Sequence, residues 1–396
     1  MNVDTAAELY WDPFLLELNT DPYPIFRRLR DEAPLYYNER HDFYAVSRAD
    51  DVERAFADNK RLINGRSDIL EFIKSGATFP PGMFIFEDAP RHTKHRGILS
   101  RVFTPKKMLA LEPEVREFCA RTLDPLVGSC GFDFVTDYAE IVSSRVIGLM
   151  LGIPEADQLA VRERLEAHVT PGQPRNIQQS SFEGAMYAQY IDWRETHPSD
   201  DLMTAMLNVE FEDETGETRK LSRQEVLTFT TLLSGAGNDT TAKLIGWIGK
   251  LLSDNPGERR LLVEDPGLIP DAVEESLRYE APGMQNARFA VEDVEFHGEV
   301  LPAGSALVCI MASANRDERR FPDADRFDVR RRPGGLLTFS FGSHFCLGAA
   351  LARLQGRVAL EEVLKRFPEW TVVDDEAVLE PTSTTRGWKH LPVVIP

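Results

Sequence analysis

FSFGSHFCLG, residues 339–348, surrounds a single cysteine with three phenylalanines and two glycines. An apolar stripe over residues 347–358 follows at helical spacing, so Cys346 is expected at the N-terminus of a helix. Free backbone N–H groups and the helix dipole favour negative charge there, and a thiolate at such a position is a soft metal ligand. The alternative is a small buried hydrophobe, the usual fate of a lone cysteine. Zinc is not expected, because no second cysteine lies near.

The longest helical pattern in the chain begins at a capping box formed by Ser222 and Glu225. Apolar residues then recur every three or four positions, predicting a helix of about thirty residues that crosses the body of the molecule. GAGNDTT, residues 235–241, should weaken this helix, because each glycine costs about 1 kcal/mol relative to alanine. One interpretation is a packing notch that lets another element cross closely. The other is a functional break at which Asp239 and Thr240 bind water and relay protons.

The rest of the chain is typical of amphipathic helix with small β-rich parts at about 35–46, 288–308 and 371–396. This pattern predicts a mainly α fold with small β-sheets, in the α+β class. Residues 64–90 are rich in Gly, Pro and Phe and are predicted to form a long functional loop with one short helix. Because we find no internal repeat and no linker, we expect one domain over residues 1–396.

The composition limits the classes of partner. The 396 residues contain 64 acidic and 45 basic side chains, a net charge of -19, which argues against nucleic acid or anionic membranes as partners. No stretch approaches the ~20 apolar residues of a membrane span, and residues 1–10 lack the features of a secretory signal. The four cysteines are too few for a disulfide framework, so a cytoplasmic protein without a membrane anchor is predicted.

These motifs, in this order, resemble the cytochrome P-450 family of haem-thiolate monooxygenases over nearly the whole chain. The cysteine stretch is similar to the family's haem-binding signature, and residues 236–241 are similar to its oxygen-activation motif. The resemblance implies the cytochrome P-450 fold, with the long helix crossing over haem b and Cys346 as the axial thiolate to its iron, and no other metal. Its chemistry would be insertion of one oxygen atom from O₂ into a C–H bond, with Asp239 and Thr240 delivering protons.

The resemblance also implies the residues around the haem. The expected haem contacts are His92, Arg96, Arg288, His344, Phe339, Gly342, Gly348 and Ala236. Glu275 and Arg278 match the family's ExxR element; Glu274 is equally well spaced to meet Arg278, and only the family alignment selects Glu275. Arg326, within FPDADRF at residues 321–327, is expected to join this ion-pair network.

Segments that are largely apolar and neutral are candidates for the substrate pocket, which predicts a hydrophobic small-molecule substrate. The candidate pocket residues are Met83, Phe84, Phe86, Leu233, Met284, Gln285 and Thr384. Residues 170–174 are a further candidate wall. Each of these is equally compatible with the protein core.

Two basic segments indicate how electrons would arrive. Residues 91–107 contain six Lys or Arg and no acidic residue, and residues 330–357 contain five and none. In the family these segments border the cysteine side of the haem. The resemblance therefore implies a basic patch for an acidic ferredoxin or flavodoxin-type donor, served by an NAD(P)H reductase, on a monomeric enzyme. The alternatives are a peroxide-driven haem-thiolate enzyme and a non-catalytic haem-binding or gas-sensing protein.

Overall fold

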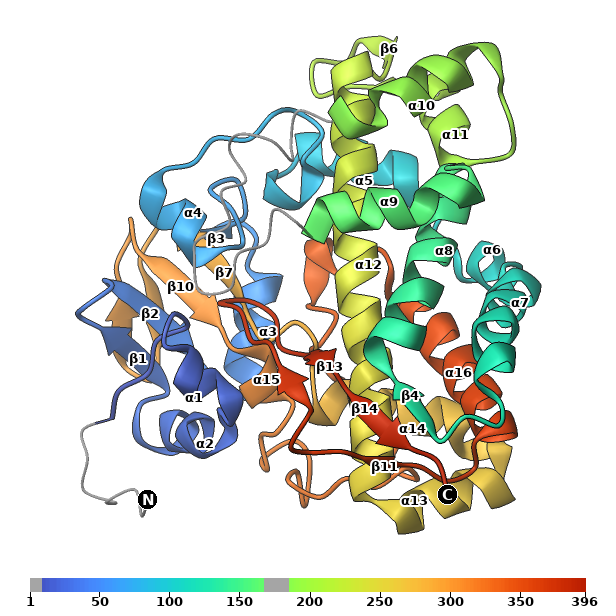
Figure 1. The fold of residues 1–396 in the computed structure, drawn as a ribbon. Coiled ribbons are helices and arrows are strands. Elements are labelled where there is room, and N and C mark those ends of the chain that lie inside the picture. The colour runs from blue at the N-terminus through green and yellow to red at the C-terminus, as the bar shows by residue number, and fades with distance from the viewer. Residues whose placement is uncertain (1–8, 167–184) are drawn as a thin grey trace.

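The computed structural model describes residues 9–166 and 185–396 and is predominantly helical (Figure 1). The α-helices of the described residues are α1 (Leu16–Thr20), α2 (Tyr23–Glu32), α3 (Ala49–Ala57), α4 (Leu70–Ser75), α5 (Arg91–Ser100), α6 (Pro105–Leu109), α7 (Glu112–Leu123), α8 (Glu140–Leu151), α9 (Glu155–Glu166), α10 (Ala185–Thr196), α11 (Leu202–Asn208), α12 (Arg223–Asp254), α13 (Pro256–Glu264), α14 (Ile269–Tyr279), α15 (Met311–Ala314) and α16 (Ala349–Arg366). The mainly α fold class predicted from the sequence is confirmed.

The strands form small sheets. They are β1 (Leu35–Asn38), β2 (Phe43–Val46), β3 (Leu62–Ile63), β4 (Gly131–Asp133), β5 (Glu210–Glu212), β6 (Thr218–Lys220), β7 (Asn286–Ala290), β8 (Val294–Phe296), β9 (Glu299–Leu301), β10 (Ala306–Cys309), β11 (Thr371–Val372), β12 (Val378–Leu379), β13 (Trp388–His390) and β14 (Pro392–Val394). The largest sheet has the order β1-β2-β10-β7-β3, in which β10 runs parallel to β2 and antiparallel to β7. Figure 1 shows this sheet to the left of α12 and the helices α7, α8 and α16 to its right.

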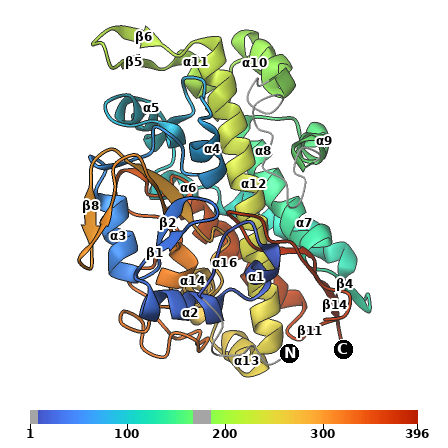
Figure 2. The ribbon, with the colours of Figure 1, turned by 90° about the vertical axis from the view of Figure 1, so that its left-hand side faces the viewer.

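Helix α12 extends through the molecule, as Figure 2 shows, and has 32 residues. Its N-terminus has the predicted capping box, because the Ser222 hydroxyl accepts from the amide of Glu225 and the Glu225 carboxylate accepts from the amide of Ser222. The helix stays continuous across residues 235–241, which confirms the predicted helix of about thirty residues and shows no break at the weak segment. A Cβ on Gly237 would lie 2.5 Å from the Ile147 side chain of α8, so this glycine is a packing notch for the crossing helix. The packing of α12 against α8 outweighs the low helix propensity of residues 235–241.

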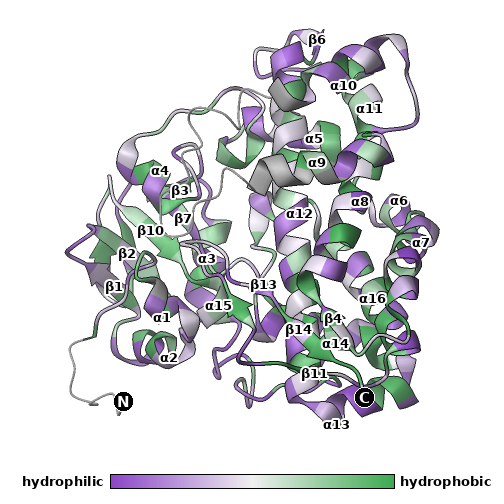
Figure 3. Cartoon of the chain, in the orientation of Figure 1, coloured by the Kyte–Doolittle hydropathy of each residue, from purple (hydrophilic) through white to green (hydrophobic). Residues whose placement is uncertain are grey.

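The apolar core lies mainly where α7, α8, α12, α14 and α16 meet. A second cluster lies beside the largest sheet and includes Val46 of β2 and Leu307 of β10. All four residues of β10 are buried, and Figure 3 shows β10 and β14 mostly in the colours of hydrophobic residues. No helix of the described ranges has both the length and the apolar character that crossing a membrane requires.

Candidate active site

The cysteine stretch forms a tight loop that ends at the N-terminus of α16. Gly342 has a φ of 72°, and a Cβ there would lie 2.8 Å from the carbonyl oxygen of Phe56, so only glycine fits. After this turn, the amide of Cys346 donates to the carbonyl of Phe339 at 2.8 Å. Helix α16 begins shortly after the cysteine, with Gly348 at its N-cap. The loop therefore holds Cys346 immediately before the helix, where the sequence predicts it.

The surroundings of the Cys346 sulfur suit an anionic metal ligand. Burial raises the pKa of the thiol, whereas the backbone N–H groups of Gly348 and Ala349 and the positive charges of Arg96 and Arg353 act to lower it. A buried thiolate needs a cation to offset the cost of desolvation, and this loop already supplies two amide donors. Cys346 is therefore suited to bind a soft metal such as the iron of a haem.

Basic and imidazole side chains from separate elements adjoin this loop. The rings of His92 in α5 and His344 stack, with centroids 4.0 Å apart, and Arg96 donates to the carbonyl of Phe345. Burial lowers the pKa of His92 to about 4 and that of His344 to about 2. Both rings are therefore neutral, and each can donate one N–H.

Acidic side chains act on these donors only beyond salt-bridge distance: the charges of Asp68 and Asp88 act on Arg288, and that of Glu87 acts on His92. Arg288 in β7 is 1% exposed and lies over the Phe56 ring at 4.6 Å, and Nε2 of His92 is buried without a hydrogen-bond partner. Within residues 9–166 and 185–396, neither residue forms an ion pair, and the same holds for Arg96 and His344. Buried donors of this kind require an acceptor. They fit the two carboxylates of a haem.

The middle of α12 is exposed to solvent, whereas most of the rest of the helix is buried or partly buried. Ala236 is exposed, and Thr240 donates from its hydroxyl to the carbonyl of Ala236 at 2.8 Å. The Asp239 carboxylate forms an ion pair with Lys243 at 2.6 Å, and Lys243 also donates to the Thr385 hydroxyl at 2.9 Å. Sequence reasoning missed Lys243, although an acid and a lysine four residues apart on a helix are a recognisable pair.

Glu275 and Arg278 of α14 form an ion pair at 2.7 Å, with both side chains fully buried. The structure places Arg331 on the same carboxylate, at 3.1 Å from Glu275. This corrects the expectation that Arg326 joins the network. The carbonyl oxygen of Arg326 accepts from Arg278 at 3.3 Å, and its side chain points away and is 62% exposed.

All five basic residues of segment 330–357 form ion pairs with acidic residues outside that segment, whereas in segment 91–107 only Arg91 and Lys94 do so among the described residues. Arg353 pairs with Glu274 at 2.5 Å, and Lys94 pairs with Glu212 at 2.7 Å. Because these acidic partners lie outside the two segments, the basic patch is smaller than the segment sequences predict. Three basic side chains near the end of α5 and in α6 make no ion pair with any described residue: Arg101, Lys106 and Lys107.

A buried ionic cluster attaches the loop before α5 to the start of α12. His95 is 1% exposed, with Nδ1 2.8 Å from Glu87 and Nε2 3.5 Å from Glu225. Burial alone would lower the pKa of His95, but hydrogen bonds to Glu225 and Glu87 outweigh it and raise the pKa to about 9. The imidazolium is therefore charged at neutral pH and bridges two carboxylates.

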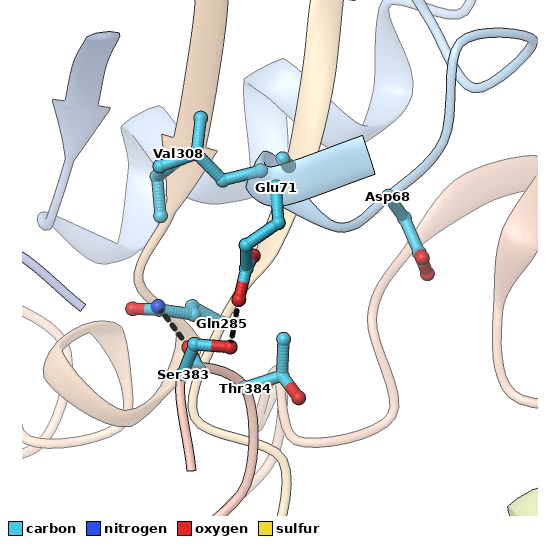
Figure 4. Close-up of a pocket in the computed structure, with 8 residues that line it drawn as sticks. Asp68, Glu71, Gln285, Val308, Ser383 and Thr384 are labelled. Carbon is cyan, nitrogen blue, oxygen red and sulfur yellow. Dashed lines mark hydrogen bonds between the residues drawn. The ribbon is translucent and has the colours of Figure 1, made fainter. Parts of the chain in front are cut away.

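The predicted pocket residues separate into two groups. Five lie in or against apolar clusters: Met83, Phe84, Phe86, Leu233 and Met284. Gln285 and Thr384 line a small recess together with Asp68 and Glu71, which sequence reasoning missed (Figure 4). The feature that could have identified Asp68 and Glu71 from the sequence is that they are acidic residues within the Gly-, Pro- and Phe-rich segment 64–90. Residues 170–174 lie outside the described residues.

A cysteine immediately before a helix, beside basic and imidazole side chains that form no ion pair among the described residues, is the arrangement expected of a thiolate-ligated haem protein. A model of the cytochrome P-450 family matches residues 267–391. The chain is 36% identical to a putative cytochrome P-450 123 of Mycobacterium tuberculosis, over 98% of this chain and 97% of that protein. It is 34% identical to a vitamin D(3) 25-hydroxylase of Pseudonocardia autotrophica, over 95% and 94%.

Solved structures agree with the relatives. A cytochrome P-450 from Chondromyces apiculatus superposes with a TM-score of 0.86 at 33% identity, covering 97% of this chain and 98% of that one. A cytochrome P-450 from Bacillus megaterium in complex with testosterone has a TM-score of 0.85 at 26% identity, covering 96% and 99%. The chain belongs to the cytochrome P-450 family. It is an oxidoreductase of the monooxygenase class, and its cofactor is a haem iron.

Proposed function

We propose that this enzyme inserts one oxygen atom from O₂ into a C–H bond of a hydrophobic small molecule. The observation that carries the proposal is the Cys346 sulfur beside two backbone amides, next to basic and imidazole side chains that form no ion pair among the described residues. Haem b, with no other metal, would bind through Cys346 and supply oxygen activation when bound. Its carboxylates would be held by His92, Arg96, Arg288 and His344, and its surroundings would include Phe339, Gly342, Gly348 and Ala236.

The role proposed for Asp239 and Thr240 is to hold and move protons beside the place where a haem would bind and supply oxygen activation. The Thr240 hydroxyl donates to the carbonyl of Ala236, which holds the side chain in place. Its oxygen can still accept a hydrogen bond from a water that relays protons. The ion pair between Lys243 and one oxygen of the Asp239 carboxylate restrains the position of this side chain. A carboxylate and a hydroxyl on neighbouring residues provide the acid–base groups that such a transfer needs.

Thr240→Ala tests this role. With O₂, NAD(P)H and a redox chain, we expect the share of electrons recovered in product to fall several-fold, with hydrogen peroxide or water formed in its place, because the proton path loses its hydroxyl. Product and peroxide are measured against NAD(P)H consumed. Thr231→Ala is the matched control, since Thr231 makes the same bond to the carbonyl four residues back, at 2.9 Å.

Three other outcomes would contradict the proposal. Equal coupling in Thr240→Ala and the wild type would remove the residue from proton delivery. Turnover with peroxide alone, and none with O₂, would identify a peroxide-driven enzyme. Haem binding without turnover under either condition would indicate a non-catalytic haem-binding or gas-sensing protein.

The hydrophobic substrate is supported by the names of similar proteins. One relative is named for 25-hydroxylation of vitamin D(3), and one similar structure holds testosterone. We further propose a monomer with one domain over the chain. A cytoplasmic location is supported by four cysteines that are all free thiols. Electrons would come from an acidic ferredoxin or flavodoxin-type donor with its NAD(P)H reductase, and no nucleic acid is involved.

The donor is proposed to dock at Arg101, Lys106 and Lys107, because their charges have no acidic partner among the described residues. For the double variant Lys106→Gln with Lys107→Gln, we expect about tenfold slower reduction by an acidic ferredoxin at low salt, and a weaker salt dependence. Stopped-flow reduction at several ionic strengths measures both. Lys94→Gln is the control, since Lys94 already pairs with Glu212. Equal effects of the two changes would argue against this docking site.

A further inference from the structure

Segment 82–87, which connects α4 to α5, packs on the first turns of α12. Gly82 has a φ of 95°, and a Cβ on this residue would lie 3.3 Å from the carbonyl oxygen of Glu225. The ring of Phe84 packs edge-on against the ring of Phe229 in α12, with centroids 5.8 Å apart. The segment therefore touches α12 through its backbone at one end and through an aromatic pair in the middle.

The same segment borders the exposed middle of α12. Leu232 is partly buried against the apolar cluster that contains Met83 and Phe86. One turn further along the helix, Ala236 is exposed. Segment 82–87 therefore forms the edge of the covering on α12, next to the residues at which a haem is expected to lie.

A buried histidine of α5 links this segment to α12. Nδ1 of His95 lies 2.8 Å from Oε2 of Glu87, and the other oxygen of Glu87 accepts from the amide of Gly82 at 3.0 Å. Nε2 of His95 lies 3.5 Å from Oε1 of Glu225, in the first turn of α12. The imidazolium is thus the cation between two buried carboxylates, one on the segment and one on the helix.

The two carboxylates depend on His95 to different degrees. Arg219 donates two hydrogen bonds to Glu225, both at 2.8 Å, and also pairs with Asp213 at 3.0 Å. Arg219 and Asp213 belong to the β5–β6 hairpin, which Figure 2 shows on the same side of α12 as α5. For Glu87, His95 is the only cation within salt-bridge distance among the described residues. Loss of the imidazolium would therefore leave Glu87 as the uncompensated charge.

A buried carboxylate without a cation is costly, and water can relieve this cost. Segment 82–87 is short, so lifting it from α12 hydrates Glu87 while the helices around it stay folded. Local opening of this kind needs less free energy than global unfolding. The ion pair between His95 and Glu87 therefore decides whether the segment stays on the helix.

The charge of His95 gives this link a pH dependence. Burial acts to lower the pKa of His95, but its hydrogen bonds to Glu225 and Glu87 raise the pKa from 6.5 to about 9. A raised pKa means that the ion pairs stabilise the folded arrangement fully below about pH 6.5 and lose this contribution as the pH rises through about 9. The segment is therefore held at neutral pH and released at alkaline pH.

We propose that His95 is a positioning residue: its imidazolium fixes segment 82–87 on α12 and thereby restricts the entry of ligands to the exposed middle of that helix. Met83, Phe84 and Phe86 then act as a closed wall at neutral pH, and they move away together when the imidazolium is lost. The assignment concerns access to the site and does not depend on the reaction proposed above.

The first test measures amide hydrogen exchange of the haem-loaded enzyme at pH 7 by mass spectrometry. In His95→Gln, the amides of segment 82–87 should exchange about tenfold faster than in the wild type, while those of α8 and α16 keep their rates. His390→Gln is the matched control, because His390 also lies beside a carboxylate, that of Asp133 at 3.3 Å, but at an exposed position. Glu87→Gln is the second variant, in case His95→Gln does not fold, and it should accelerate the same amides.

The second test measures ligand entry. Its probe is 4-phenylimidazole, an apolar compound whose ring nitrogen binds haem iron, mixed with the haem-loaded enzyme in a stopped-flow instrument. We expect the association rate at pH 7 to be about fivefold higher in His95→Gln than in the wild type, because the segment no longer covers the edge of α12. In the wild type the rate should rise between about pH 8 and about pH 10, and His95→Gln should lack this rise.

Four results would overturn the assignment. These are wild-type exchange of segment 82–87 in both His95→Gln and Glu87→Gln, faster exchange spread evenly over the whole chain, an association rate that His95→Gln leaves unchanged, and a pH-dependent rise that persists in His95→Gln. Neither test needs turnover. A failed monooxygenase assay with these effects intact would therefore reject only the proposed function, and the reverse pattern would reject only the role of His95.

Discussion

Cys346→Ala is expected to lose the strongly red-shifted Soret band that a thiolate-ligated haem shows when it is reduced and bound to carbon monoxide, and its monooxygenase activity should fall below detection. The alanine methyl group cannot ligate iron, and Cys346 is the cysteine that has two backbone N–H groups and two arginines acting on its sulfur. Without the anionic sulfur, the electron donation that favours O–O cleavage is absent. Difference absorption spectroscopy of the reduced protein measures the band.

Two further variants make this result decisive. Cys346→His should retain haem with the spectrum of a histidine ligand, which separates loss of the thiolate from loss of the fold. Cys130→Ala removes an exposed free thiol and should leave the spectrum unchanged. A red-shifted band that survives in Cys346→Ala would show that another residue ligates the iron.

Glu275→Gln is expected to destabilise the haem-loaded protein by about 3–5 kcal/mol, because it leaves a buried guanidinium without its counter-charge. Both side chains of the Glu275–Arg278 pair are fully buried. The adjacent change, Glu274→Gln, should cost only about 0–1 kcal/mol, since Glu274 and Arg353 are partly exposed to solvent. Urea unfolding followed by haem absorbance gives both values.

The same measurement decides between the two arginines. Arg331 is 18% exposed and contacts Glu275, whereas the Arg326 side chain is 62% exposed and pairs loosely with Asp328 at 3.8 Å. Arg331→Gln should therefore destabilise the protein clearly more than Arg326→Gln. If Arg326→Gln had the larger effect, the network described here would be wrong.

Features that depend on neighbouring residues were predictable from the sequence. The capping box that starts α12 needs only Ser222 and Glu225, three positions apart. The β1–β2 hairpin follows from two short apolar runs around a turn, and Tyr36 pairs with Ala45 as such a hairpin requires. The sequence left open whether residues 235–241 form a packing notch or a functional break, because the packing of α8 on Gly237 is a contact between distant segments.

The site residues also fall into those that local sequence patterns predict and those that depend on contacts between distant segments. The sequence alone determined the position of Cys346 before a helix, the long helix that carries Asp239 and Thr240, and the motifs of the family. Only the tertiary structure decided which arginine reaches Glu275, which basic side chains are already paired, and that Glu71 and Gln285 meet at Ser383. Helical periodicity and capping act over a few residues, whereas ion pairs and recesses depend on how segments far apart in the chain pack together.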